Sequence, residues 1–190
     1  MATRNNFKDL KYVLTDEDTI AFNKHYLLHS KAGKKMIMEQ RIIFPVLTVV
    51  VFAMMRFFKF GNTLTLVVVG LLAAASVYVL FNAEKMLIKQ QEKAVRKAAF
   101  NLESINKEES ILKFRDENIY SSYEGAESEI EYDKIFKVSM SETGIYLWIS
   151  ETSAMPIPVS AFPREEGMPK LFDYLKEKCP DATFEDYFRA

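Results

Sequence analysis

The sequence is poor in cysteine, histidine, glycine and proline. Its 190 residues include one cysteine, two histidines and six each of glycine and proline. A single cysteine excludes an intrachain disulfide framework, and the low glycine and proline contents exclude collagen-like and low-complexity chains. Hydrophobic residues make up 49% of the chain, which excludes a wholly disordered protein.

Motifs of common catalytic and cofactor sites are also absent. The sequence has no GxxxxGK(S/T) or GxGxxG loop, no HExxH, no CxxC and no GxSxG. No histidine follows His29, so the C-terminal half offers no imidazole that could activate a serine. We therefore predict a non-enzymatic protein with no catalytic residues, no cofactor and no bound metal. The alternative is a membrane enzyme.

Charge is divided unevenly along the chain. The net charge is -1, but residues 1–107 contain 16 basic and 8 acidic side chains, and residues 108–190 contain 9 basic and 18 acidic ones. An asymmetry this large indicates that the two halves face different electrostatic surroundings. The acidic half repels phosphate, so we predict that nucleic acid is not a partner.

Two long apolar runs in the basic half predict transmembrane helices. Residues 64–81 contain no charge, and these 18 residues would span about 27 Å at about 1.5 Å per residue, close to the hydrocarbon thickness of a bilayer. The run 42–55 is shorter and reaches residue 60 if Arg56 and Lys59 extend to the headgroups. The alternative for each run is a buried helix of a soluble core.

The two runs together predict a hairpin at residues 34–83. We expect spans at about 42–60 and 63–83, with the turn marked by Gly61 and Asn62. Pro45 is expected in the first turn of its span, where its missing N–H costs little.

Cations on either side of the spans predict the orientation. Only Arg56 and Lys59 lie in the short connection of the hairpin, whereas ten cations flank its other end, and the positive-inside rule then places both termini in the cytoplasm. A reducing compartment agrees with the lone Cys179. The ten flanking cations are Lys24, Lys31, Lys34, Lys35, Arg41, Lys85, Lys89, Lys93, Arg96 and Lys97.

The cations nearest the spans are candidate contacts for lipid headgroups. A cation close to an anionic leaflet contributes on the order of 1 kcal/mol of attraction. The alternative is that these cations only fix the topology. The candidates are Lys31, Lys34, Lys35, Arg41, Lys85 and Lys89.

Two further features lie inside the predicted hairpin. Gly70 and Ala74 are four residues apart and form a small face that permits close helix packing, within the hairpin or between two chains of a homo-oligomer. The simpler interpretation is packing within the hairpin. Arg56 is an ionisable residue near the membrane, which makes it a functional candidate, although its place beside the turn is explained by snorkelling.

The segments on either side of the hairpin are predicted to be a strand and two helices. In residues 1–33 we expect a strand at 7–14 and an amphipathic helix that begins after Thr15, and in residues 84–107 a helical extension. The first helix carries His25 and His29, an i, i+4 pair that could hold a metal. No third ligand is evident, so we interpret this pair as part of an ordinary helix surface.

From residue 108 the pattern changes to the two-residue alternation of β-strands. Residues 112–115 alternate, and IYLWI at 145–149 is apolar enough for a central strand. MPIPV at 155–159 has alternate prolines and is expected at a sheet edge. An apolar face after Pro169 predicts a last helix. Residues 108–190 are thus predicted to form five or six short antiparallel strands closed by one helix.

A domain this small needs further coverage for its core. The strand at 7–14 is the candidate, since it would lie on the same side of the membrane and could pair across the base of the hairpin. The predicted fold class is therefore an α+β membrane protein, with a two-helix transmembrane hairpin inserted in a cytoplasmic antiparallel β domain capped by a C-terminal helix.

Four carboxylates alternate along one predicted strand. A row of this kind could bind a divalent cation or take part in acid–base chemistry, and the alternative is a solvated outer face. The row consists of Glu127, Glu129, Glu131 and Asp133.

A set of residues in the second half carries a resemblance to a known family. Tyr132, Ile135 and Val138, the IYLW strand at 145–148 and residues 158–162 before the last helix are arranged as in the YcxB-like family of bacterial membrane proteins, which the chain resembles over most of its length. The resemblance implies a domain similar to bacterial pleckstrin-homology-like (PH-like) folds, a bent antiparallel sheet capped by a helix. It implies no activity and no catalytic residues.

Two classes of non-enzymatic function remain for a protein of the bacterial plasma (inner) membrane. The first is a bilayer-anchored module that presents a sheet edge, an acidic face or a groove to an unidentified protein partner. An acidic surface favours a basic partner, and a lipid-headgroup sensor is the alternative within this class. The second class is an immunity or regulatory protein that acts through its transmembrane hairpin.

Overall fold

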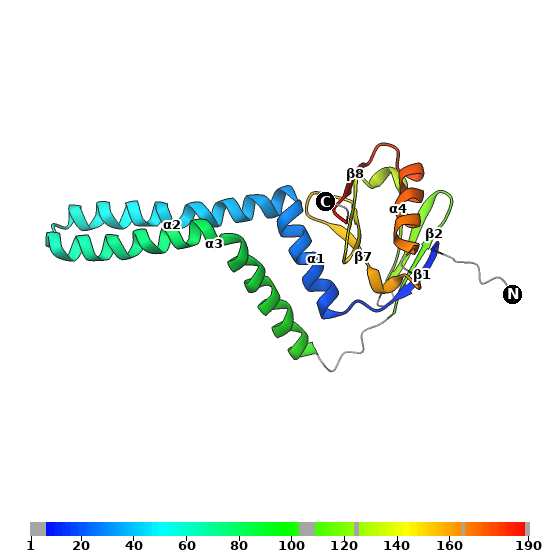
Figure 1. The fold of residues 1–190 in the computed structure, drawn as a ribbon, viewed down its shortest axis with the longest axis horizontal. Coiled ribbons are helices and arrows are strands. Elements are labelled where there is room, and N and C mark those ends of the chain that lie inside the picture. The colour runs from blue at the N-terminus through cyan, green and yellow to red at the C-terminus, as the bar shows by residue number, and fades with distance from the viewer. Residues whose placement is uncertain (1–6, 103–108, 124–125, 165, 189–190) are drawn as a thin grey trace. The chain divides into compact units, whose positions relative to one another are not determined.

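The computed structural model describes residues 7–102, 109–123, 126–164 and 166–188. The chain divides into two compact units (Figure 1). Residues up to Phe22 and from Val95 onward form an α+β unit, and Asn23–Ala94 form a helical unit. The α+β unit is therefore discontinuous in sequence, because the helical unit lies between its two parts.

Three helices precede the main β region. The first two meet at Ser30, whose side chain accepts a 2.8 Å hydrogen bond from the Gly33 N–H and so caps the second helix. Thr15 caps the first helix as predicted, because its Oγ1 accepts from the Asp18 N–H while Asp18 Oδ2 accepts from the Thr15 N–H. The three helices are α1 (Asp16–His29), α2 (Lys31–Phe57) and α3 (Asn62–Leu102).

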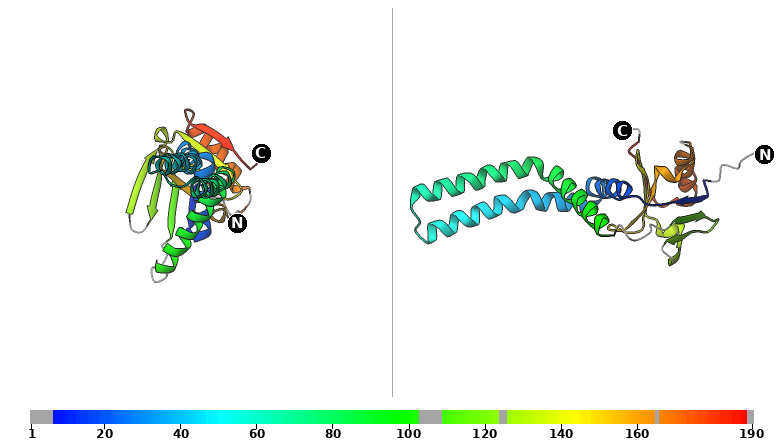
Figure 2. Two further views of the ribbon diagram at one scale, coloured as in Figure 1. Left: turned by 90° about the vertical axis from the view of Figure 1, so that its left-hand side faces the viewer. Right: turned by 90° about the horizontal axis from the view of Figure 1, so that it is seen from below.

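Helices α2 and α3 run side by side as a hairpin (Figures 1 and 2). The turn lies between Phe57 and Asn62, as the sequence predicted, and Lys59 occupies it with a φ of 56°.

Both hairpin helices are longer than the predicted spans. Because α2 begins at Lys31, Pro45 lies inside the helix and not in its first turn, which corrects that expectation. Proline has no N–H, so the carbonyl of Arg41 receives no i to i−4 bond from it. Helix α3 continues without a break to Leu102, and residues 103–107 of the predicted extension lie outside the described residues.

The α+β unit contains two four-stranded sheets. The first sheet has the order β1-β2-β3-β4 and the second has the order β7-β6-β5-β8. The strands and the helix between β7 and β8 are β1 (Asp9–Tyr12), β2 (Ser110–Phe114), β3 (Asn118–Tyr123), β4 (Ala126–Glu131), β5 (Lys137–Ser141), β6 (Gly144–Trp148), β7 (Ala154–Pro158), α4 (Gly167–Lys178) and β8 (Thr183–Asp186).

The sheet order confirms three predictions and corrects one. The strand before the hairpin is present as β1 and pairs antiparallel with β2, with Leu10 opposite Leu112. Strand β6 is interior, and the proline-containing β7 is at an edge. The correction concerns the end of the chain: β8 follows α4 and pairs in parallel with β5, so the domain is not wholly antiparallel and α4 is not its last element.

One hydrophobic core joins both sheets and α4. The two sheets are also linked directly, because the Tyr12 hydroxyl donates a 3.1 Å hydrogen bond to the carbonyl of Pro156 in the edge strand β7. The largest fully buried side chains of this core are Leu10, Leu112, Ile119, Val138, Ile145, Leu147, Ile157, Leu171 and Leu175.

Candidate functional site

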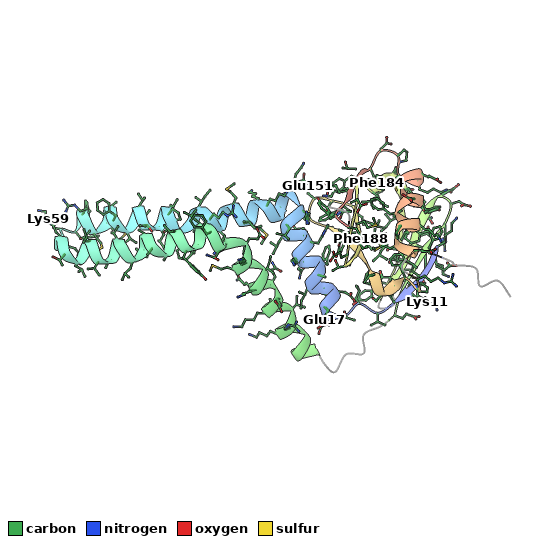
Figure 3. The ribbon with its side chains drawn as sticks, viewed as in Figure 1. Lys11, Glu17, Lys59, Glu151, Phe184 and Phe188 are labelled. Carbon is green, nitrogen blue, oxygen red and sulfur yellow. The ribbon has the colours of Figure 1, made fainter. Side chains whose placement is uncertain are left out.

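The hairpin carries its apolar side chains on the outside. Helices α2 and α3 are long and apolar enough to span a membrane, yet only 6% and 17% of their most apolar windows are buried. The core helix of a soluble protein would be mostly buried. Phe57 and Phe81 are each 80% exposed, and side chains stand out along both helices (Figure 3). The hairpin surface is therefore suited to an apolar solvent.

The interior of the hairpin is an apolar cluster to which both helices contribute. Ile37 of α2 packs in one cluster with Val79, Ala83 and Leu87 of α3. A polar contact crosses the same interface, where the hydroxyl oxygens of Thr48 and Ser76 lie 2.9 Å apart. The sequence analysis did not single out this pair, although two hydroxyl residues in otherwise apolar runs were the available signal.

Gly70 and Ala74 do not lie in that interface. Both are exposed, and a Cβ placed on Gly70 would have no neighbour within 4 Å. The interpretation that they pack against α2 is therefore not supported, because Ser76 and Ala83 occupy the contact positions instead. Packing of this face between two chains stays a prediction.

The six candidate lipid contacts gather at the end of the hairpin away from the turn. Ile37 and Leu87 pack in the same cluster, so the cations of both helices lie at this end. Arg41 is half-buried, and its Nε atom has no hydrogen-bond partner among the described residues. The other five, which are exposed, are Lys31, Lys34, Lys35, Lys85 and Lys89.

The opposite end of the hairpin holds the remaining two cations. Arg56 Nη1 donates to Asn62 Oδ1 at 3.1 Å, which connects the end of α2 to the start of α3. Lys59 lies in the turn itself (Figure 3).

The two histidines lie together on α1. The centroids of the His25 and His29 rings are 4.6 Å apart, and His25 is buried. Over the described ranges, no group of three or more His, Cys, Asp or Glu side chains is placed to hold a metal ion. The burial of His25 corrects the expectation that the pair belongs to an ordinary helix surface.

The predicted row of carboxylates is largely on β4, but its side chains engage the neighbouring strands. Glu129 accepts from Arg115 Nη1 at 2.6 Å and from Asn118 Nδ2 at 3.0 Å. A hydrogen bond to Glu127 is the main cause that raises the pKa of Tyr120 above its usual value. Asp133 lies beyond the strand, in the short 3₁₀ helix Tyr132–Lys134. The row thus forms part of a face where opposite charges are paired.

Buried titratable groups in the α+β unit are held in their neutral forms. Burial raises the pKa of the Cys179 thiol to about 11, so it is protonated near neutral pH and is a poor nucleophile. Burial, with the negative charge of Asp18, also raises the pKa of Tyr12. These shifts accompany packing and do not assemble a reactive group.

Comparison with known proteins gives one family. Residues 114–175 match the family model described as YcxB-like protein, from the last residue of β2 into α4. The resemblance is thereby confirmed for this segment, which includes Tyr132, Ile135, Val138 and the IYLW strand. No curated protein and no solved structure matches the chain.

Proposed function

We propose that this chain is a non-enzymatic protein of the bacterial plasma membrane that presents a cytoplasmic interaction domain on a transmembrane hairpin. The observation that carries the proposal is the outward-facing apolar surface of α2 and α3. In water this surface would drive aggregation, whereas in a bilayer it replaces contacts between lipids. Both segments are continuous helices, the form in which a backbone can cross a bilayer with its N–H and C=O groups paired, apart from the Arg41 carbonyl opposite Pro45.

The pairing of β1 with β2 supports the same side of the membrane for both termini. The hairpin lies between these strands in the sequence, so two membrane crossings return the chain to the side of the membrane on which β1 lies. The excess of cations at the far end of the hairpin supports a cytoplasmic location for that side.

The strand order supports a PH-like domain. A four-strand meander, a three-strand meander and a helix follow one another, with β1 supplied from before the hairpin. The match to the YcxB-like family model lies within this region. The partner we propose for the domain is a basic protein, because residues 108–190 hold 18 acidic and 9 basic side chains.

Topology reporters test the membrane part of the proposal. Fusions after Asn62 and after Ala190 should report an external turn and a cytoplasmic C-terminus. An external C-terminus would overturn the orientation. A full-length chain that stays monodisperse in detergent-free buffer would overturn membrane insertion itself.

A second candidate is a regulatory or immunity role inside the bilayer, favoured by the exposed Gly70 and Ala74 face. Replacing both spans by an unrelated apolar hairpin separates the two candidates. Retained function would support the cytoplasmic module, and loss of function despite normal insertion would support the hairpin. Crosslinking in native membranes, compared at low and high salt, then tests for a basic partner, since screening weakens such association.

A further inference from the structure

A groove of about 500 Å³ follows one flank of the hairpin next to its turn. Phe52 of α2 and Leu66 of α3 are large side chains on its lining, while Gly70 and Ala73 keep it hollow because they have little or no side chain. A Cβ on Gly70 would meet nothing within 4 Å. Arg56 lines the end of the groove at the turn.

The length of the groove matches one leaflet. Its lining on α3 runs from Asn62 to Ala73, which is about 16 Å at about 1.5 Å per residue. Half of the hydrocarbon thickness of a bilayer is about 15 Å. With the turn at the headgroup level, the groove therefore runs from the interface towards the middle of the membrane.

The polar end of the groove is suited to a phosphate. A guanidinium has five N–H donors, and Asn62 accepts from one of them on Arg56, which orients the group at the mouth. Arginine binds phosphate through paired, charge-assisted hydrogen bonds.

A second hollow near the turn provides a contrast. It has a volume of about 640 Å³ and is lined by Val51, Met54, Met55, Phe58 and Phe60, without any charged side chain. It offers hydrocarbon contacts alone. The groove beside Arg56 combines an apolar lining with a cation at the end next to the turn, where the lipid headgroups would lie.

We propose that the groove beside Arg56 binds one anionic phospholipid. The phosphate lies on the Arg56 guanidinium, and one acyl chain follows the flank of α3 over Gly70 and Ala73. This inference rests on the proposed function, because the groove meets lipid only if the hairpin spans the bilayer. It identifies a ligand class and a site at the end of the hairpin opposite the predicted headgroup cations.

Photocrosslinking in reconstituted bilayers tests the site. The full-length protein is placed in phosphatidylcholine nanodiscs with a small fraction of phosphatidylglycerol that carries a diazirine on its acyl chain, and labelled peptides are mapped. The matched probe is phosphatidylcholine with the same diazirine chain. We expect the phosphatidylglycerol probe to label residues 66–73 about tenfold more than the matched probe, because the choline ammonium of the matched probe offsets the attraction of its own phosphate for Arg56.

Filling the groove should abolish this preference. Gly70→Leu directs a side chain into the hollow from a Cβ that has no neighbour within 4 Å, and leucine favours a helix more than glycine does. Ala74→Leu is the control, because it places the same leucine side chain on α3 outside the groove lining. We expect loss of the selective labelling with Gly70→Leu and no change with Ala74→Leu.

Removing the cation should act on headgroup selectivity. Arg56→Gln is expected to bring phosphatidylglycerol labelling down about tenfold, to the phosphatidylcholine level. Lys59→Gln removes the same charge from the turn and should leave the preference intact. Millimolar glycerol phosphate should not compete, since a free phosphate lacks the acyl chain that occupies the trough.

Each outcome separates the inference from the proposed function. Equal labelling by both probes around the whole hairpin would mean ordinary surrounding lipid and would overturn the inference while supporting insertion. Equal effects of Gly70→Leu and Ala74→Leu would also overturn it. An absence of acyl-chain labelling along α2 and α3 would overturn membrane insertion, and the lipid site with it.

Discussion

Gly144 occupies a position where both the backbone conformation and the neighbouring strand exclude a side chain. Its φ is 152°, and a Cβ there would lie 2.2 Å from the carbonyl oxygen of Ile157 in β7. Gly144→Ala should destabilise the α+β unit by about 3 kcal/mol, from overpacking and an unfavourable φ together. Denaturation of the full-length protein in detergent, followed by the fluorescence of Trp148, measures this change, because Trp148 is the single tryptophan and lies in β6.

Gly167→Ala is the matched control for this measurement. The nearest atom to a Cβ at Gly167 is the side-chain Cδ1 of Phe162 at 3.1 Å, and the position is the first residue of α4. A flexible ring can yield, and alanine favours the helix, so we expect a change below about 1 kcal/mol. Similar losses for both variants would contradict the role given to Gly144.

The buried thiol of Cys179 makes the α+β unit sensitive to alkali. Burial raises its pKa from 9.0 to about 11, so the folded state keeps a proton that the unfolded state loses. The associated stability is complete below pH 9 and is lost as the pH rises through 11. Relative to Cys179→Ala, the unsubstituted protein should lose about 1–2 kcal/mol over this range.

Urea denaturation at pH 8, 10 and 11 checks the prediction for Cys179. The raised pKa values of Tyr12 and Tyr146, caused mainly by burial, act in the same direction in both proteins, so the difference between the proteins reports the thiol together with its influence on the pKa of Tyr132. If the free energy of unfolding fell equally with pH in the unsubstituted protein and in Cys179→Ala, the contribution of the thiol would be ruled out.

At the scale of elements, the contact between α2 and α3 can be tested by crosslinking. The hydroxyl oxygens of Thr48 and Ser76 are 2.9 Å apart, so Thr48→Cys with Ser76→Cys, in a Cys179→Ala background, should form a disulfide in membranes. Adding Ala83→Leu should lower the yield, because Ala83 is fully buried between the helices. Ala74→Leu is the exposed control and should leave the yield unchanged. Equal disulfide yields with Ala83→Leu and with Ala74→Leu would place the interface between α2 and α3 elsewhere.

Strand and helix periodicity could be read directly from this sequence, and so could the pairing of β1 across the hairpin, but the parallel pairing of β8 could not. The prolines of β7 predicted an edge, and the apolar run of β6 predicted an interior strand, because each pattern has a local cause. Strand β8 escaped prediction, since Thr183–Asp186 is short, half charged and pairs with β5 from more than 40 residues away. This strand is specified by its tertiary contacts and not by a local sequence pattern.

The candidate site was predictable in the same uneven way. Charge-free length identified the hairpin, whereas spacing alone could not say which side of α3 faces α2, and Gly70 proved to lie outside the contact. Polar residues at 31–41 concealed the early start of α2. The groove depends on side chains from both helices, so only the small residues near Arg56 hinted at it.

At the scale of the whole molecule, a crosslink between β1 and β2 tests whether both flanks of the hairpin share one side of the membrane. Lys11 lies opposite Ile111, a spacing of about 4.5–5.5 Å between Cα atoms that a disulfide bridges. Lys11→Cys with Ile111→Cys, again with Cys179→Ala, should therefore crosslink in intact membranes.

An offset pair is the control for the crosslink between the strands. Val13 and Lys113 are four residues out of register, about 13 Å, so Val13→Cys with Lys113→Cys should not crosslink. Failure of the in-register pair in correctly inserted protein would exclude the discontinuous sheet.

The pairing of β1 with β2 also determines the order of events during synthesis of the chain. Lys11 and Glu109, which form an ion pair at 3.5 Å beside the paired strands, are 98 residues apart in the chain. At a synthesis rate of about 5–20 residues per second, β1 emerges from the ribosome about 5–20 s before its partner exists. Leu10, buried in the finished sheet, has no β2 to cover it during that interval. The hairpin is translated within the same interval, so under the proposed membrane topology its insertion can begin before the sheet is able to close.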